Sequence, residues 1–261
     1  MLRLVELEHT FNQGTPMAKA ALSGVSLHLA PGEFACVVGS NGAGKSTLLN
    51  AVAGVYQPDH GQVVIDGQDV TLQVEHRRAR SVGRVFQNPL HGTAPAMTVE
   101  ENLALAAKRG KPLGLGMILT RPRRSEIREQ LAALGLGLED RLSTKVGLLS
   151  GGQRQALTLL MATLVQPKVL LLDEHTAALD PATADRVLAI TARLVKEQRL
   201  TTLMVTHNLA HAIALGDRLL MMNNGRIVHD LRGQEKASLT IEQLRSLFTG
   251  QGIYDDRALL A

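Results

Sequence analysis

A glycine-rich loop between two apolar segments constrains the fold of this chain more than any other feature. Residues 39–46 fit the pattern G-x-x-x-x-G-K-[ST]. Residues 33–38 before the loop predict a buried strand, and the apolar residues after it predict a helix. Glycine permits torsions that turn successive N–H groups toward one anion, and a helix N-terminus adds positive potential. The predicted phosphate site consists of Gly39, Ser40, Asn41, Gly42, Ala43, Gly44, Lys45, Ser46 and Thr47.

Two side chains of this loop have the chemistry of a nucleoside triphosphate site. Lys45 can reach the β- and γ-phosphates of ATP, and the Ser46 hydroxyl can ligate Mg²⁺. A purely structural glycine turn is the alternative. The strand before the loop and the helix after it favour phosphate binding over that alternative.

A second chemical signal follows an apolar strand predicted at residues 169–172. The strand ends in Asp173 and Glu174, and neighbouring strand residues face opposite ways, so the two carboxylates can act separately. Asp173 suits the coordination shell of Mg²⁺, often through water. Glu174 suits a general base that polarises the attacking water. Because strands often end in acidic residues, this pair is informative only together with the phosphate loop.

Strands that alternate with helices predict an α/β fold, here a P-loop NTPase core with a mainly parallel sheet. Residues 1–30 predict an N-terminal antiparallel β subdomain with a turn near residues 12–16. Residues 61–70 predict a hairpin whose turn is Asp66-Gly67. We expect one domain over residues 1–261, with these parts: a nucleotide-binding core with the β subdomain at 1–87 and 166–230, an inserted α-helical subdomain at 88–165 and a short C-terminal helical tail at 231–261.

Capping signals predict where several helices begin. Thr98 and Glu101 have the spacing of a capping box, and Ser150 precedes a helix that runs to about residue 165. Asp180 followed by Pro181 predicts an N-cap and first helical residue for a helix over about 181–197. Three further segments are expected as follows: an Arg-rich turn at 121–124, a helix near 126–134 and a β-rich run at 201–205.

Composition limits the setting and the partners of the chain. No stretch of eighteen or more uncharged apolar residues occurs, so we predict no transmembrane helix, and the alternating N-terminus predicts no signal peptide. The single cysteine, Cys36, predicts a buried structural thiol in a reducing compartment. The net charge is +4, but only 2% of residues are aromatic, which leaves few groups for stacking on bases. We therefore expect no nucleic-acid partner.

A pentapeptide at residues 149–153 identifies the class of protein. The sequence Leu149-Ser150-Gly151-Gly152-Gln153 has the features of a second anion site, with a serine cap and glycine N–H groups at a helix N-terminus. By itself, this serine is equally an ordinary N-cap. Together with the phosphate loop, the pentapeptide resembles the signature of the ATP-binding cassette (ABC) family, over about residues 2–230. The resemblance implies a homodimer in which the signature of one copy covers ATP on the phosphate loop of the other.

The same resemblance implies roles for residues elsewhere in the chain. Gln87 matches the loop glutamine that senses Mg²⁺ and the γ-phosphate, and His207 matches the switch histidine that contacts the γ-phosphate. Asp180 belongs to the loop that crosses the dimer interface. Phe11 sits where the family stacks an aromatic ring on adenine, with core packing as the alternative. The implied sets are as follows: Glu174, His207, Gln87 and Lys45 for catalysis, and Ser46, Gln87 and Asp173 for the metal.

Two histidines raise separate questions. His175 replaces the proline that commonly follows the catalytic glutamate in the family, and we expect a titratable group near the γ-phosphate without a catalytic role. His211 lies one helical turn after His207, as in a zinc-binding pair. The zinc-protease pattern needs glutamate directly after the first histidine, and here Asn208 takes that position.

The resemblance also implies partners. It predicts a peripheral subunit on the cytoplasmic face of the inner membrane that drives an integral membrane permease. One cassette per chain resembles bacterial importers, and residues 92–98 and 170–181 are similar to a subgroup linked to uptake that depends on an extracytoplasmic solute-binding protein, with amino acids as the associated cargo. An ABC exporter ATPase and a non-transport ABC ATPase acting on the ribosome or DNA are the alternatives.

Two surface segments are candidates for contact with the membrane partner. Residues 88–105 are expected to form a groove that receives a permease helix, with residues 91–97 as the contact edge. The apolar stretch 113–119 lies beside the arginines of 121–128 and could touch the bilayer or the permease. An ordinary surface loop is the alternative for the second segment.

Overall fold

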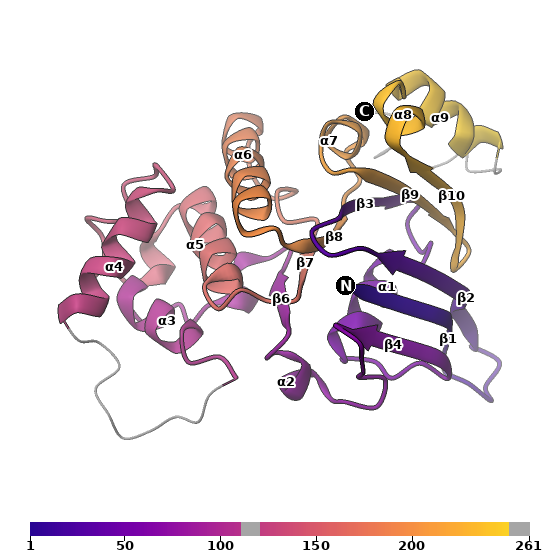
Figure 1. Cartoon of the computed structure of the whole chain (residues 1–261), viewed down its shortest axis with the longest axis horizontal. Coiled ribbons are helices and arrows are strands. Elements are labelled where there is room, and N and C mark those ends of the chain that lie inside the picture. The colour runs from indigo at the N-terminus through magenta and orange to yellow at the C-terminus, as the bar shows by residue number, and fades with distance from the viewer. Residues whose placement is uncertain (111–120, 251–261) are drawn as a thin grey trace.

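The computed structural model describes residues 1–110 and 121–250, and it contains two sheets (Figure 1). The smaller sheet is antiparallel, as predicted, with strand order β2-β1-β4-β5. Its turn between β4 and β5 has positive φ at Asp66 and Gly67, which confirms the hairpin. The strands are β1 (Leu2–Phe11), β2 (Lys19–Leu29), β4 (His60–Ile65) and β5 (Gln68–Asp69).

The larger sheet has strand order β10-β9-β3-β8-β7-β6 and is parallel except for the β9–β10 hairpin. The prediction of a mainly parallel core sheet is therefore confirmed. Because β3, β7 and β8 run in the same direction, their carboxyl ends meet at one edge of the sheet. The strands are β3 (Phe34–Gly39), β6 (Val82–Val85), β7 (Val169–Asp173), β8 (Thr201–Val205), β9 (Arg218–Asn223) and β10 (Arg226–Arg232).

Three of the helices form a separate group at one end of the molecule. Figure 1 shows α3, α4 and α5 gathered at the end of the molecule away from the antiparallel sheet. These three helices lie between β6 and β7 in the sequence, where a helical insertion was predicted. The helices are α1 (Lys45–Ala53), α2 (Glu75–Arg78), α3 (Val99–Ala106), α4 (Arg121–Ala132), α5 (Gly151–Thr163), α6 (Pro181–Gln198), α7 (Leu209–Ala214), α8 (Gly233–Ala237) and α9 (Ile241–Gly250), with 3₁₀ turns η1 (Pro89–Gly92) and η2 (Val146–Leu148).

Strand β3 explains why the run before the phosphate loop is apolar throughout. Phe34, Cys36 and Val38 pack into one hydrophobic cluster, whereas Ala35 and Val37 pack into the cluster on the other face. A parallel strand that is covered on both faces needs apolar residues at every position. Burial raises the pKa of the Cys36 thiol to about 12, which confirms a structural thiol.

The structure corrects the expected Arg-rich turn at residues 121–124, because α4 begins at Arg121 and includes this segment. Arginine has good helix propensity, so a run of arginines does not by itself end a helix. The prediction for residues 113–119 lies outside the described residues. Strands β6, β9 and β10 were not predicted. The capping box at Thr98 and the N-cap at Ser150 are confirmed.

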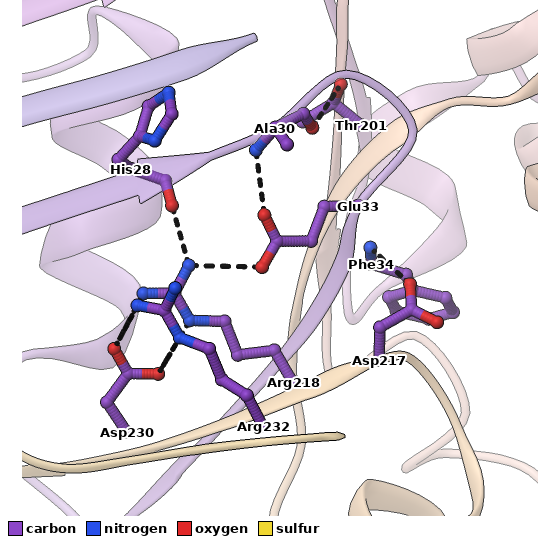
Figure 2. Close-up of polar contacts among 9 residues, drawn as sticks. All are labelled: His28, Ala30, Glu33, Phe34, Thr201, Asp217, Arg218, Asp230 and Arg232. Atoms are coloured by element: carbon purple, nitrogen blue, oxygen red, sulfur yellow. Dashed lines mark hydrogen bonds and ion pairs between the residues drawn. The ribbon is translucent and has the colours of Figure 1, made fainter.

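A buried arginine connects the two sheets (Figure 2). The Arg218 guanidinium on β9 donates to the His28 carbonyl oxygen at 2.6 Å and to both carboxylate oxygens of Asp230 at 2.6 and 2.7 Å. It also lies 3.1 Å from the Glu33 carboxylate, and Arg232 pairs with Asp230 from the solvent side. These charge-assisted bonds fix β2 of the antiparallel sheet against β9 and β10 of the core sheet.

The helices of the described ranges, 1–110 and 121–250, include none with the length and hydropathy needed to cross a bilayer.

Candidate nucleotide site

The phosphate loop follows β3 and leads into α1, as predicted. Gly42 and Gly44 have φ values of 80° and 100°, in the left-handed region that favours glycine. A side chain at Gly44 would also collide with the backbone carbonyl of Ala21. The loop can therefore curl only with glycine at these positions, and its N–H groups lie at the N-terminus of α1, where an anion is favoured.

Lys45 is buried within this loop. Its ammonium donates hydrogen bonds to the carbonyl oxygens of Gly39 at 2.6 Å and Ser40 at 2.9 Å. The side chain is 7% exposed, so its charge is held close to the loop. A phosphate bound on the loop would lie close to this charge, because both carbonyl groups that accept from the ammonium belong to the loop itself.

A cavity of about 300 Å³ lies over the loop. Phe11 and Lys19 border it on the antiparallel sheet, and Glu174 borders it on the core sheet. Residues 41–47 form its floor. In the part of the chain that the structure describes, no residue of the 149–153 segment lines this cavity. The two predicted phosphate-binding segments therefore do not meet within one copy of the chain.

Glu174, Gln87 and His207 meet at the carboxyl edge of the core sheet, from β7, the segment after β6 and the segment after β8. The Gln87 amide donates to the Glu174 carboxylate at 3.3 Å, and His207 Nδ1 lies 3.4 Å from the same oxygen. The hydrogen bond from His207 lowers the pKa of Glu174, although partial burial opposes this shift. Glu174 is therefore ionised at neutral pH, as a general base must be.

Asp173 has a partner that the sequence did not reveal. The Arg84 guanidinium on β6 lies 3.4 Å from the Asp173 carboxylate. Arg84 pairs with Leu171 in the parallel register, so it shares a face of the sheet with Asp173. Burial raises the pKa of Asp173, and the charge of Arg84 acts in the opposite direction.

The signature segment begins α5. The Ser150 hydroxyl accepts a hydrogen bond from the Gln153 N–H, and the Gln153 side chain accepts one from the Ser150 N–H. A side chain at Gly152 would collide with the methyl group of Thr183 on α6. Glycine therefore allows α5 to approach α6 closely at the end that Ser150 caps.

A family model described as ABC transporter matches residues 22–177, more than half of the chain. The chain belongs to this family. A tyrosine transport ATP-binding protein of Clostridioides difficile (strain R20291) is 45% identical to the cassette over 248 residues, covering 95% of this chain and 98% of the relative. A methionine import ATP-binding protein, MetN, of Caulobacter vibrioides (strain ATCC 19089 / CIP 103742 / CB 15) is 37% identical and covers 88% of this chain and 66% of the relative.

Solved cassettes share the fold of this ABC protein. A dimeric post-hydrolysis structure of the ATP-binding cassette MJ0796 bound to ADP and Pi has a TM-score of 0.75 and 28% identity, covering 89% of this chain and 98% of that chain. The ADP conformation of the cassette MJ1267 has a TM-score of 0.77 and 26% identity, covering 98% and 99%. The protein is thus an ATP-binding ABC subunit that hydrolyses ATP to energise transport.

Two other predicted site residues of the cassette, Asp180 and Phe11, have clear positions. Asp180 caps α6, where its carboxylate accepts from the Thr183 N–H at 3.1 Å, and its side chain is exposed. Phe11 lines the cavity, but it also makes edge contacts with His9 and Tyr56. This ring is therefore supported by the small aromatic cluster and also borders the cavity, so both the stacking role and the packing alternative remain open.

His175 of the cassette does not lie where it was expected. It is 2% exposed, and its Nε2 lies 3.0 Å from the Thr191 hydroxyl on α6. Burial lowers the pKa of His175 to about 4, with a further contribution from His211. The expectation of a titratable group near the γ-phosphate is wrong, because the ring packs under α6 and stays neutral at neutral pH.

The alternative of a zinc pair at His207 and His211 finds no support in the cassette. His211 lies 3.7 Å from Asp185 on α6, and His207 faces Glu174 instead. Over the described ranges, no group of three or more His, Cys, Asp or Glu side chains could hold a metal. A metal at this site would therefore need oxygen ligands from the nucleotide itself, as is usual for Mg²⁺.

Proposed function

We propose that two copies of this cassette clasp ATP between them and energise the import of a solute through a separate membrane permease. The observation that carries the dimer is the separation of the 149–153 segment from the cavity over the phosphate loop. A helix N-terminus above the phosphates then has to come from a second copy. Support comes from MJ0796, which is dimeric in its structure with ADP and Pi.

We propose the following roles within this dimer. Residues 39–47 bind the triphosphate, and Phe11 stacks on the adenine. Leu149, Ser150, Gly151, Gly152 and Gln153 contact the ATP held by the opposite copy. Asp180, exposed at the start of α6, lies at the dimer interface.

The residues near Asp173 fit a Mg²⁺ ion that arrives with ATP. The Ser46 hydroxyl, the Gln87 amide oxygen and the Asp173 carboxylate are hard oxygen ligands, and Mg²⁺ prefers one or two carboxylates together with substrate phosphates. Ser46 is exposed at the start of α1, beside the cavity. When bound, Mg²⁺ would neutralise charge on the β- and γ-phosphates.

Hydrolysis then depends on positioning by the residues of this chain. Lys45 turns its ammonium from the carbonyls of the loop to the β- and γ-phosphates. Glu174 orients a water molecule and accepts its proton as the water oxygen attacks the γ-phosphorus, and the bond to ADP breaks. His207 and Gln87 contact the Glu174 carboxylate and hold it beside the γ-phosphate. After phosphate leaves, the bonds between the copies are lost and the dimer opens.

The names of the relatives support import and a small-solute cargo. The relatives include a tyrosine transport protein and proteins named for methionine and sulfate/thiosulfate import. We propose amino acids as the cargo class, delivered by an extracytoplasmic solute-binding protein. The cassette then works on the cytoplasmic face of the membrane, against the permease.

A groove of about 370 Å³ between β6, α2, α3 and α5 is the proposed permease site. Its walls are apolar at Phe86, Leu105 and Met161, which suits a helix from the permease. Within the expected contact edge at residues 91–97, Gly92 is the sole member that lines the groove over the described ranges, and contact of this edge with the permease stays a prediction. The loop at Met97 is instead fixed to η2, where Val146 N–H donates to its carbonyl oxygen.

We propose that the chain acts as one domain with the parts predicted from its sequence. The core with the β subdomain comprises residues 1–87 and 166–230, and the helical signature subdomain comprises 88–165. Residues 231–261 form the C-terminal tail, and its described part contains α8 and α9. The buried bonds of Arg218 support treating the β subdomain and core as one unit.

The decisive experiment uses the Glu174→Gln variant, which keeps the volume of the side chain but cannot accept a proton. We expect hydrolysis to fall by roughly 10²- to 10⁴-fold, while ATP converts the monomer to a stable dimer on size-exclusion chromatography. A Ser150→Glu change in the same chain should prevent dimerisation, because its charge repels the phosphates. A Glu174→Gln protein that stays monomeric with saturating Mg²⁺ and ATP would contradict the proposal.

A further inference from the structure

Arg84 lies between the candidate metal site and the groove on the surface. It is on β6, and its side chain is 12% exposed. On one side its guanidinium lies 3.4 Å from the Asp173 carboxylate. On the other side Arg84 lines the groove together with Phe86. One side chain thus contacts the proposed Mg²⁺ ligand and the proposed permease site.

The guanidinium of Arg84 is held in place by an aromatic ring and is paired with a single carboxylate in the described ranges. The guanidinium carbon lies 4.6 Å from the centre of the Phe86 ring, a cation–π contact. Asp173 is its one carboxylate partner in the described ranges, and Nε is buried without a hydrogen-bond acceptor. A buried donor without an acceptor costs free energy, so a position of Arg84 in which Nε finds an acceptor is favoured.

A positive charge beside Asp173 opposes a cation at the same carboxylate. Both Arg84 and Mg²⁺ need the electron pairs of Asp173, and their charges repel each other at short range. The Asp173 side chain is 16% exposed, so water screens this repulsion only in part.

We propose that Arg84 sets the affinity of the nucleotide site for Mg²⁺ by competing with the metal for Asp173. This inference rests on the proposed role of Asp173 as a Mg²⁺ ligand. Without metal, Arg84 keeps the carboxylate paired. With metal, Arg84 gives up the carboxylate and turns toward the groove that it also lines.

The test compares ATP affinity with and without metal in the full-length chain, in the non-hydrolysing Glu174→Gln background. Equilibrium dissociation constants for ATP are measured by calorimetry in excess Mg²⁺ and in EDTA. The constant in EDTA divided by the constant in excess Mg²⁺ reports how strongly metal and nucleotide favour each other's binding, and a larger ratio means stronger coupling. We expect Arg84→Met, which keeps an unbranched apolar stem but removes the guanidinium, to raise this ratio about fivefold, the size of a partly exposed ion pair.

Two variants show whether the charge of Arg84 is responsible. Arg84→Lys keeps the positive charge that repels the metal and should leave the ratio within about twofold of the parent value. Arg80→Met removes an exposed arginine next to Ala79, which lines the groove, and should also leave the ratio unchanged. Thermal melts confirm that each variant is folded.

Three outcomes would overturn the inference: an unchanged or lower ratio in Arg84→Met, an equal rise in Arg84→Lys, or an equal rise in Arg80→Met. Asp173→Asn separates this inference from the proposed function. A loss of the Mg²⁺ effect in Asp173→Asn together with an unchanged Arg84→Met would leave Asp173 as a ligand and reject the role of Arg84. A full Mg²⁺ effect in Asp173→Asn would reject both the role of Asp173 as a Mg²⁺ ligand and the role of Arg84.

Discussion

The side-chain amide of Gln155 donates a hydrogen bond of 3.2 Å to the carbonyl oxygen of Phe86. Gln155 is 1% exposed and lies on α5, the helix that Ser150 caps. Phe86 directly precedes Gln87, which contacts Glu174. The bond therefore connects the signature helix, which we propose to contact one ATP, with the glutamine loop that we propose to contact the other.

Replacing Gln155 tests this connection. Gln155→Leu keeps most of the volume but leaves the Phe86 carbonyl unpaired, at a cost of about 1–3 kcal/mol in the free energy of unfolding. We expect kcat for ATP hydrolysis to fall about tenfold with little change in KM, because Gln87 loses its support but the phosphate loop does not. Thr163→Val is the matched control, since it removes buried hydrogen bonds within the same helix. A kcat equal to that of Thr163→Val would show that Gln155 acts on stability alone.

The close approach of α5 to α6 predicts a specific rescue. Gly152→Ala places a Cβ against the Thr183 methyl group and should cost about 1–3 kcal/mol of stability. It should also lower ATPase activity, because the N-terminus of α5 shifts away from its position on α6. Thr183→Ser removes that methyl group, so the double variant should recover both properties. Urea denaturation and steady-state kinetics measure the two effects, and an unrecovered double variant would refute the steric explanation.

The Arg218 network predicts how stability depends on pH. Burial would raise the pKa of Asp230, but hydrogen bonds from Arg218 and Arg232 lower it from 3.8 to about 2. A carboxyl with a depressed folded pKa adds stability above its unfolded pKa and loses it as pH falls toward its folded pKa. The wild-type protein should therefore lose stability between about pH 4 and pH 2 more steeply than Asp230→Asn does. Urea unfolding across this range checks the slope, with the exposed Asp140→Asn as a control that should match the wild type.

The groove predicts that transport and hydrolysis can be separated. Leu105 is 41% exposed at the groove, so Leu105→Gln changes its chemistry without disturbing the core. Loss of one apolar anchor should weaken permease binding by about 1–2 kcal/mol, which is roughly tenfold in affinity. Transport in vesicles should fall far more than the ATPase activity of the isolated chain. Met97→Gln, outside the groove lining, should have the smaller effect, and the reverse order would favour the 91–97 edge.

Local patterns in the sequence were enough to predict those parts of the site that lie within a single segment of the chain. The phosphate loop, the acidic end of β7 and the cap at Ser150 depend on torsions and periodicity within a few residues. The same holds for β3, whose unbroken apolar run reports burial on both faces. The Arg-rich turn failed because a cluster of charges reports solvent exposure and says little about backbone shape.

Contacts between distant segments were decided only by the tertiary structure. Arg84 meets Asp173, Gln155 meets Phe86 and His175 turns under α6 because particular strands and helices are neighbours. Single-segment patterns carry no information about such neighbours, and β6, which places Arg84, was itself too short to be predicted. The sequence alone determined which chemistry the chain contains. The tertiary structure decided which of these groups lie together in one site, since register and packing bring side chains together across long separations in sequence.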